Sequence, residues 1–272
     1  MEIDSREEMI RLRNSKLQFF EDTHKYLVGE REFKSVTTFI HDFFPKFDAK
    51  TAILKMKKSG SFAKRFKNRT EESVIEEWDA SGKSAAALGT QLHLCIEKTY
   101  RGEDVGNIDE IAKEFGQFKK FHENTHNIIT PYAFEWRVYD EDIGIAGSID
   151  AVFTKNNKFY IYDWKRVKEM KTDNQYETAF PPISHLDNCN FYQYALQLNM
   201  YKYILESKYD TFVEELILVI MHPNMRKYSL LKLPLLKEEI QTMLNYAPAI
   251  SEPAEEEEEE PESLLLDFIE KK

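Results

Sequence analysis

The sequence predicts an α/β domain of the α+β kind, with a mixed central β-sheet flanked by helices and an N-terminal helical region. Three observations predict it. Helical periodicity dominates the first half after a short β-rich stretch, strand patterns fill residues 128–165, and a long helix followed by two strands completes the chain. Helices that precede a sheet, together with a helix that interrupts it, are typical of this architecture.

The first half holds most of the predicted helices. Residues 16–40 are predicted as short strands around a turn, with a helix that begins near Ser35. Helix resumes after Pro45 and again over residues 71–100, where Gly82 is a candidate break. Apolar residues four apart predict one buried face of this helix: Leu88, Leu92 and Ile96. A second amphipathic helix, residues 108–124, is expected to pack through Ile108, Ile111, Phe115, Phe118 and Phe121.

The second half supplies the sheet. Strands are predicted at 128–138, 144–154 and 158–165, then a loop at 181–188 that leads into a helix at 188–206. Two strands, 211–223 and 226–234, and a helix at 235–247 follow, without any internal repeat. We therefore expect residues 1–84 and 85–250 to form one domain, with the chemistry in the second range, and residues 251–272 to form a disordered acidic tail.

Composition limits the class of protein. The apolar content of 42% is ordinary for a globular chain, and no apolar run approaches the ~20 residues that cross a bilayer. The charged N-terminus is unlike a secretory signal. Two distant cysteines, Cys95 and Cys189, cannot supply a four-cysteine iron–sulfur or zinc site. We expect an intracellular protein in a reducing compartment, cytoplasm or nucleus, without a membrane partner.

The net charge of −11 is unevenly distributed. Residues 251–272 carry ten acidic residues and two lysines, so the other 250 residues carry only −3. Seven basic residues and no acidic one lie between 53 and 69, and such clustering is typical of nucleic-acid binding. A solvated helix face explains the segment equally well. The seven are Lys55, Lys57, Lys58, Lys64, Arg65, Lys67 and Arg69.

The acidic tail ends in an apolar cluster. An apolar segment at the end of an acidic stretch without a core suggests a peptide that docks on a partner protein. Packing back onto its own domain, or competition of the acidic run with DNA for a basic groove, are open alternatives. The cluster consists of Leu264, Leu265, Leu266, Phe268 and Ile269.

Two carboxylates are predicted to face each other across a hairpin. Asn156 and Asn157 suit the left-handed backbone of a two-residue turn, and counting back from that turn places Asp150 opposite Asp163. Opposed carboxylates repel, so a divalent cation is an expected partner. Lys165 lies on the same face as Asp163 and would sit beside that ion, although a surface salt bridge between the two is the simpler alternative.

Two helices bracket this hairpin in the sequence. His93 lies on the helix at 71–100, one turn from Gly89 and Glu97, and a lone helical histidine is often structural. On the later helix, Gln193, Gln197 and Tyr201 recur every four residues and form a polar edge. That edge either contacts buried partners or faces solvent.

Taken together, these motifs resemble the RecB-like branch of the PD-(D/E)xK nucleases, which includes mitochondrial genome-maintenance exonucleases and CRISPR adaptation nucleases. GSID at 147–150 is similar to the first-acid motif, YDWK at 162–165 to the second, and QLNMY at 197–201 to a Q-x-x-x-Y helix. The resemblance covers about 85–203, and the N-terminal region is similar in style to nucleases of large DNA viruses. It implies a restriction-endonuclease-like fold.

The resemblance also implies roles for particular residues. Mg²⁺ or Mn²⁺ would be bound by His93, Asp150, Asp163 and the backbone carbonyl of Trp164, with Glu135 as an outer ligand or structural acid. Lys165 would act on the attacking water, and Gln197 and Tyr201 would fix Lys165 and the phosphate. Subgroups with an iron–sulfur cluster are disfavoured, because two cysteines cannot build one.

The expected activity is therefore metal-dependent hydrolysis of DNA, by an exonuclease acting on ends in replication, recombination or repair. The basic segment would guide single- or double-stranded DNA, and the tail would bind a replication or recombination protein. The alternatives are a catalytically inactive nucleic-acid-binding scaffold on the same fold, and an RNA nuclease.

Overall fold

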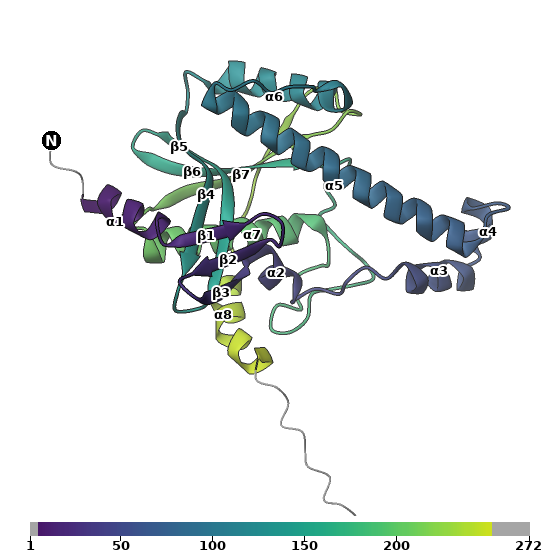
Figure 1. Cartoon of the computed structure of the whole chain (residues 1–272). Coiled ribbons are helices and arrows are strands. Elements are labelled where there is room, and N and C mark those ends of the chain that lie inside the picture. Colours follow the sequence, from purple (N-terminus) through teal and green to yellow (C-terminus); the bar gives the residue numbers. More distant parts are fainter. Residues whose placement is uncertain (1–4, 252–272) are drawn as a thin grey trace, which may run out of the picture.

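A mixed eight-stranded sheet forms the centre of the computed structural model, which describes residues 5–251 and, for 247–251, the backbone alone (Figure 1). The strand order is β1-β2-β3-β5-β6-β7-β8, and β4 pairs with β5 outside this path. Two pairings are parallel, β3 with β5 and β6 with β7; the others are antiparallel. The strands are β1 (Leu17–Phe20), β2 (Lys25–Val28), β3 (Arg31–Ser35), β4 (Thr130–Asp140), β5 (Ile145–Lys155), β6 (Lys158–Arg166), β7 (Val213–Met221) and β8 (Ser229–Lys232).

Helices cover both faces of the sheet, so the predicted mixed α/β class is confirmed. One face packs on α5 and α6 through a core that includes Leu92, Phe118 and Trp164, and the other on α2, α7 and α8. The helices are α1 (Ser5–Asn14), α2 (Val36–His41), α3 (Ala49–Lys58), α4 (Ser61–Arg65), α5 (Glu71–Arg101), η1 (Asp109–Ile111), α6 (Ala112–Thr125), α7 (Asn190–Lys208) and α8 (Lys237–Ser251). No helix of the described part combines the length and apolarity needed to cross a bilayer.

The helix α5 extends well beyond the sheet and carries a second small core (Figure 1). Ile53 of α3, Phe62 of α4 and Val74 of α5 are buried against one another there, with Trp78 beside them. We call α3, α4 and the first turns of α5 the arm. The helix runs unbroken through Gly82, so no break occurs there, and the 84/85 boundary falls inside it.

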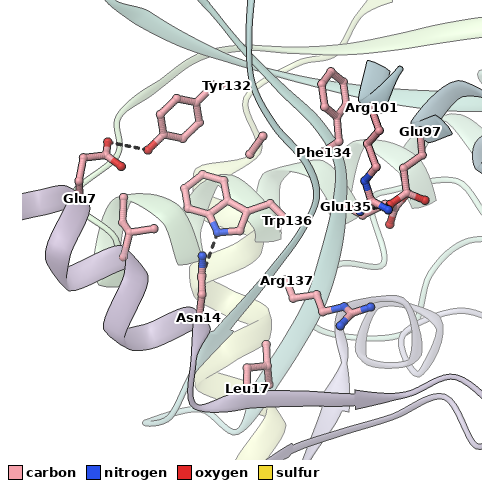
Figure 2. Close-up of a pocket in the computed structure, with 12 residues that line it drawn as sticks. Glu7, Asn14, Leu17, Glu97, Arg101, Tyr132, Phe134, Glu135, Trp136 and Arg137 are labelled. Atoms are coloured by element: carbon pink, nitrogen blue, oxygen red, sulfur yellow. Dashed lines mark hydrogen bonds and ion pairs between the residues drawn. The ribbon is translucent and has the colours of Figure 1, made fainter. Parts of the chain in front are cut away.

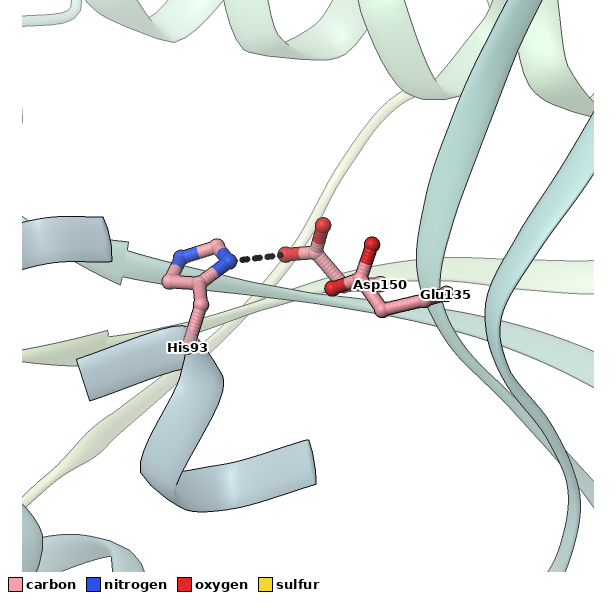
Figure 3. Close-up of side chains that lie close together, drawn as sticks. All are labelled: His93, Glu135 and Asp150. Atoms are coloured by element: carbon pink, nitrogen blue, oxygen red, sulfur yellow. Dashed lines mark ion pairs between the residues drawn. The ribbon is translucent and has the colours of Figure 1, made fainter. Parts of the chain in front are cut away.

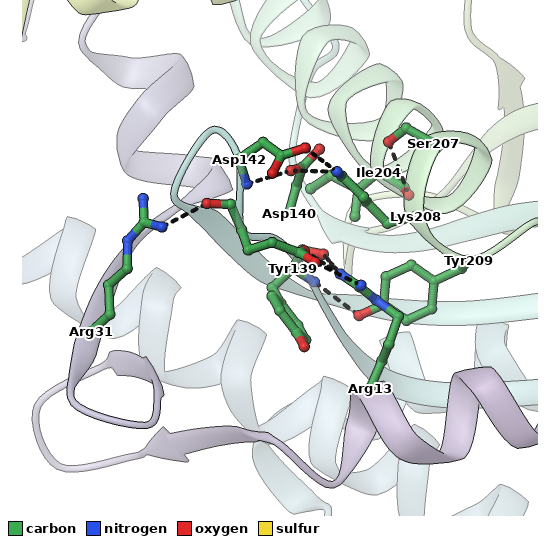
Figure 4. Close-up of polar contacts among 10 residues, drawn as sticks. Arg13, Arg31, Tyr139, Asp140, Asp142, Ile204, Ser207, Lys208 and Tyr209 are labelled. Carbon is green, nitrogen blue, oxygen red and sulfur yellow. Dashed lines mark hydrogen bonds and ion pairs between the residues drawn. The ribbon is translucent and has the colours of Figure 1, made fainter.

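A polar network joins α1, the end of β4 and the end of α7 (Figure 4). Arg13, near the end of α1, donates to the carbonyl of Tyr139 at 2.9 Å and pairs with Glu141. The Tyr209 hydroxyl accepts from the Tyr139 amide at 3.1 Å, inside the core.

The sequence pattern did not predict α1, whose ten residues bury only Ile10. The predicted tail cluster, Leu264–Leu266, Phe268 and Ile269, lies outside the described residues.

Candidate active site and metal centre

The predicted hairpin is present with the predicted register. Asn156 and Asn157 both have positive φ, 51° and 59°, and the ladder runs from Lys155 opposite Lys158 to Ala151 opposite Tyr162. Asp150 and Asp163 occupy the next position, where the ladder between β5 and β6 ends. Beyond it β6 pairs only with β7, while β5 is joined on that edge by β3 at Ile145 and Ala146. The two acids therefore lie where the sheet forks.

Asp150 satisfies a backbone group that the fork leaves without a strand partner. Its Oδ2 accepts from the Trp164 amide at 2.9 Å. A buried N–H without a partner is costly, so this bond fixes the carboxylate at the fork. The same oxygen lies 3.4 Å from Nδ1 of His93, which approaches from α5.

His93 joins α5 to both acid motifs: it faces Asp150 (Figure 3) and also contacts Trp164. Its Nε2 lies 2.7 Å from the Trp164 carbonyl oxygen. A carbonyl can only accept, so Nε2 carries the hydrogen and Nδ1 is the nitrogen that faces Asp150. Histidines that bind metals usually donate their other ring N–H to such an acceptor. The predicted ligand Trp164 thus orients the histidine through its carbonyl.

Glu135 completes a group of three. Ligand atoms of His93, Glu135 and Asp150 all lie within 4.8 Å of one another. Glu135 is in β4, between residues that pair with Ala151 and Ile149, which places it across from Asp150. Its φ is +44°, an unusual conformation that costs on the order of 1–3 kcal/mol for a residue with a side chain. Ser148 donates to its Oε2 at 2.8 Å.

The electrostatics of this group favour a positive partner. Burial, and then the charge of Asp150, raise the pKa of Glu135 from 4.5 to about 7. Burial and the same neighbour raise the pKa of Asp163 to about 6. The surroundings thus disfavour the charged form of both carboxyls, a condition that a bound cation relieves.

Asp163 and Lys165 form a buried ion pair on one face of β6. Their side chains are 3% and 17% exposed, and Lys165 Nζ lies 2.7 Å from Asp163 Oδ2. This Oδ2 is enclosed by the protein, so the ammonium group of Lys165 is the nearby charge that balances it. Burial lowers the pKa of Lys165, but Asp163 and Asp150 outweigh it and raise that pKa overall. Lys165 is therefore a cation, and the exposed salt bridge considered as the alternative does not describe this pair.

The polar edge of α7 makes different contacts from those expected. The Lys165 ammonium lies over the ring of Tyr194, 4.8 Å from its centroid. Gln197 donates to Thr37 on α2 at 3.5 Å, and Gln193 to Asn188. Sequence reasoning missed Tyr194, although it lies three residues before Gln197 and on the same helical face.

Tyr201 is buried under the fork. A Cβ at Gly147 would come within 2.7 Å of Tyr201 Cε1, so only glycine permits this close approach to β5. Burial raises the pKa of the Tyr201 phenol well above 10, although a hydrogen bond with Gln197 opposes the shift. Tyr201 therefore contacts both Gln197 on its own helix and β5 at Gly147.

The donor set fits a divalent cation such as Mg²⁺ or Mn²⁺. One imidazole nitrogen and carboxylate oxygens from Glu135 and Asp150 converge, and Asp163 lies close enough to raise the local negative charge. These hard oxygen donors suit Mg²⁺ and Mn²⁺. Without a cation or a proton between them, His93 Nδ1 and Asp150 Oδ2 would face each other as two acceptors.

A cavity of about 530 Å³ opens beside Glu135 (Figure 2). Glu97 and Arg101, one turn apart on α5, form an ion pair of 2.6 Å and reach toward Glu135 in this view. Arg137, two residues along β4, also lines the cavity. Among the candidate ligands, Glu135 alone lines this cavity, and the guanidinium groups of Arg101 and Arg137 border it.

The predicted basic segment lies on the arm. With a rise of 1.5 Å per residue, the 19 steps along α5 from Val74 to His93 span about 28 Å, which separates the core of the arm from the candidate metal centre. Three of its cations are paired, Lys55 with Glu177, Lys57 with Glu71 and Arg69 with Glu77. The others have no carboxylate partner among the described side chains: Lys58, Lys64, Arg65 and Lys67.

Comparison with known proteins adds little. No family model and no curated protein matches the chain. Among solved structures, the crystal structure of SSO0001 aligns with a TM-score of 0.36 and 14% sequence identity, over 94% of this chain and 91% of that chain. A likeness of this strength carries no argument about function.

Proposed function

We propose that the protein is a divalent-metal-dependent nuclease that hydrolyses DNA phosphodiester bonds and acts on DNA ends as an exonuclease. The observation that supports it best is the fork, which gathers His93, Glu135 and Asp150 within 4.8 Å next to the buried pair Asp163–Lys165. The sequence motifs that resemble RecB-like nucleases fall on these same residues. Mg²⁺ or Mn²⁺ would be held by His93 Nδ1 with Glu135, Asp150 and Asp163.

Each residue has a separate task in this proposal. A bound ion would neutralise charge on the scissile phosphate and make water a better nucleophile. Lys165, held by Asp163 and the ring of Tyr194, presents a fixed cation that stabilises the charge developing on the phosphate oxygens. Asp163 and Asp150 raise the pKa of Lys165, which favours the charged form that this role requires. Trp164 keeps His93 and Asp150 in place through its two backbone groups.

The test is a degradation assay on DNA labelled at either end, single- and double-stranded, with Mg²⁺, Mn²⁺ or EDTA. We expect the parent protein to degrade DNA only with a divalent metal. Lys165→Ala should lower the rate by about 100-fold or more, because removal of one preorganised charge donor typically costs that much. Lys158→Ala is the matched control, since Lys158 lies on the same strand in an exposed pair with Glu214.

Equal rates for Lys165→Ala and the parent, with both proteins folded by circular dichroism, would overturn the proposal. Degradation that persists undiminished in EDTA would do the same. A protein that binds DNA but never degrades it would instead be the inactive scaffold.

A further inference from the structure

Two aromatic side chains are unusually exposed to solvent. Tyr176 is 88% exposed and Phe47 is 75% exposed, the highest values among large apolar side chains of the described residues. Both line one cavity of about 820 Å³, between α3 and the loop 167–189. Exposed rings grouped in one concave place usually mark a binding surface.

Cations border the same cavity. Lys46 and Lys55 line it, and the arm with its unpaired lysines continues from α3. Two carboxylates also line it, but each has partners. Asp48 caps α3 by accepting from the amides of Lys50 and Thr51. Glu177 accepts from Lys55 at 3.2 Å, which leaves Lys46 as the lining cation without a carboxylate partner among the described side chains.

The aromatic surface continues onto the arm. The ring of Phe47 lies 5.8 Å from that of Trp78, which in turn lies 5.9 Å from Phe66. Arg65 lies over the Phe66 ring, 5.3 Å from its centroid. Three rings thus run from the cavity onto the arm and end at a cation, and rings together with cations are the combination that binds single-stranded nucleic acids.

The loop that carries Tyr176 connects this surface to the candidate active site. It begins directly after β6, the strand of Lys165, and ends at α7, the helix of Tyr194. Backbone bonds fix it beside the start of the arm, since the Phe180 amide donates to the Phe43 carbonyl at 2.8 Å. A DNA strand bound at this surface would therefore contact the loop that directly follows β6, the β-strand that carries Lys165.

We infer that this surface binds single-stranded DNA, with bases stacked on Phe47 and Tyr176 and phosphates near Lys46 and the unpaired cations of the arm. The inference rests on the proposed function and specifies its substrate. Duplex DNA has its base faces already stacked inside the helix, so only a single strand can use the two rings. Single-stranded ends would accordingly be held in preference to duplex ends.

The test compares affinities for a fluorescent (dT)₂₀ and a 20-base-pair duplex by anisotropy, in EDTA so that neither is degraded. The double variant Phe47→Ala/Tyr176→Ala should bind (dT)₂₀ at least about 10-fold more weakly, because each stacked ring contributes substantially, and duplex within about 2-fold of the parent. Tyr176→Phe keeps the ring and should bind like the parent. Phe212→Ala is the matched control, since Phe212 is 73% exposed and does not line this cavity.

Unchanged (dT)₂₀ binding in the double variant would overturn the inference, as would equal weakening of single strand and duplex. A loss matched by Phe212→Ala would also overturn it. These outcomes are independent of hydrolysis. Parent protein that binds (dT)₂₀ through the two rings but degrades no DNA would refute the nuclease proposal and leave this binding surface standing.

Discussion

Glu135→Gln removes the charge of Glu135, the candidate-site residue with a positive φ, and leaves the size of its side chain unchanged. Glutamine keeps the shape of the side chain, and its carbonyl can still accept from Ser148. The pKa of Glu135 is raised from 4.5 to about 7, first by burial and then by Asp150. The substitution therefore removes a carboxyl group whose ionisation destabilises the folded protein when no metal is bound.

The sign and size follow from this shift. Well below pH 4.5 the carboxyl is protonated in both the folded and the unfolded chain, and it costs nothing. As the pH rises, the unfolded chain ionises first, so stability falls until about pH 7 and then stays low. A shift from 4.5 to about 7 corresponds to about 3 kcal/mol, at 1.36 kcal/mol per unit.

We therefore expect Glu135→Gln to raise the free energy of unfolding by about 3 kcal/mol at pH 8 in EDTA, and by less than about 1 kcal/mol at pH 5. Urea unfolding followed by far-UV circular dichroism measures both values. Adding Mn²⁺ at pH 8 should stabilise the parent far more than the variant. Equal stability of the two proteins at pH 8, or the same difference at both pH values, would refute the reasoning.

Three further substitutions test packing and a buried ion pair in the fold. Gly147→Ala places a Cβ 2.7 Å from Tyr201 Cε1 and should destabilise the fold by about 1–3 kcal/mol; Gly116→Ala, whose Cβ would meet nothing within 4 Å, should gain up to about 1 kcal/mol in urea unfolding. Arg166→Met leaves the carboxylate of Glu114, 1% exposed, without its 2.7 Å partner, and should cost about 3–5 kcal/mol. Matching behaviour of the two glycine variants, or an unchanged midpoint for Arg166→Met, would contradict these expectations.

The parts of the fold that local sequence determines were predictable. The Asn156–Asn157 turn fixes the hairpin register, because a two-residue loop allows one pairing of the flanking strands. The stripe that includes Leu92 and Ile96 correctly predicted which face of α5 is buried. Both features depend on contacts within a few residues or on one helical period.

Features that depend on distant partners were not predictable. The helix α1 buries one side chain and is held by Arg13, whose acceptors Tyr139 and Glu141 lie more than a hundred residues away in sequence. The spacing of α7 indicates a polar face, but it cannot tell that Gln197 meets Thr37. Nor does spacing reveal that the sheet forks at Asp150, because the fork requires β3 to take the place of β6 along β5.

Calorimetric titration with Mn²⁺ tests the central claim, a metal centre at the fork, most directly. We expect the parent protein to bind Mn²⁺ at pH 7.5, and Asp150→Asn to lose that binding, because the variant removes the carboxylate that lies nearest His93. Asp142→Asn, an exposed acid on the β4–β5 turn paired with Lys208, should bind like the parent. Mn²⁺ binding that is equally strong in Asp150→Asn, or absent from the parent, would contradict a metal centre built from these residues.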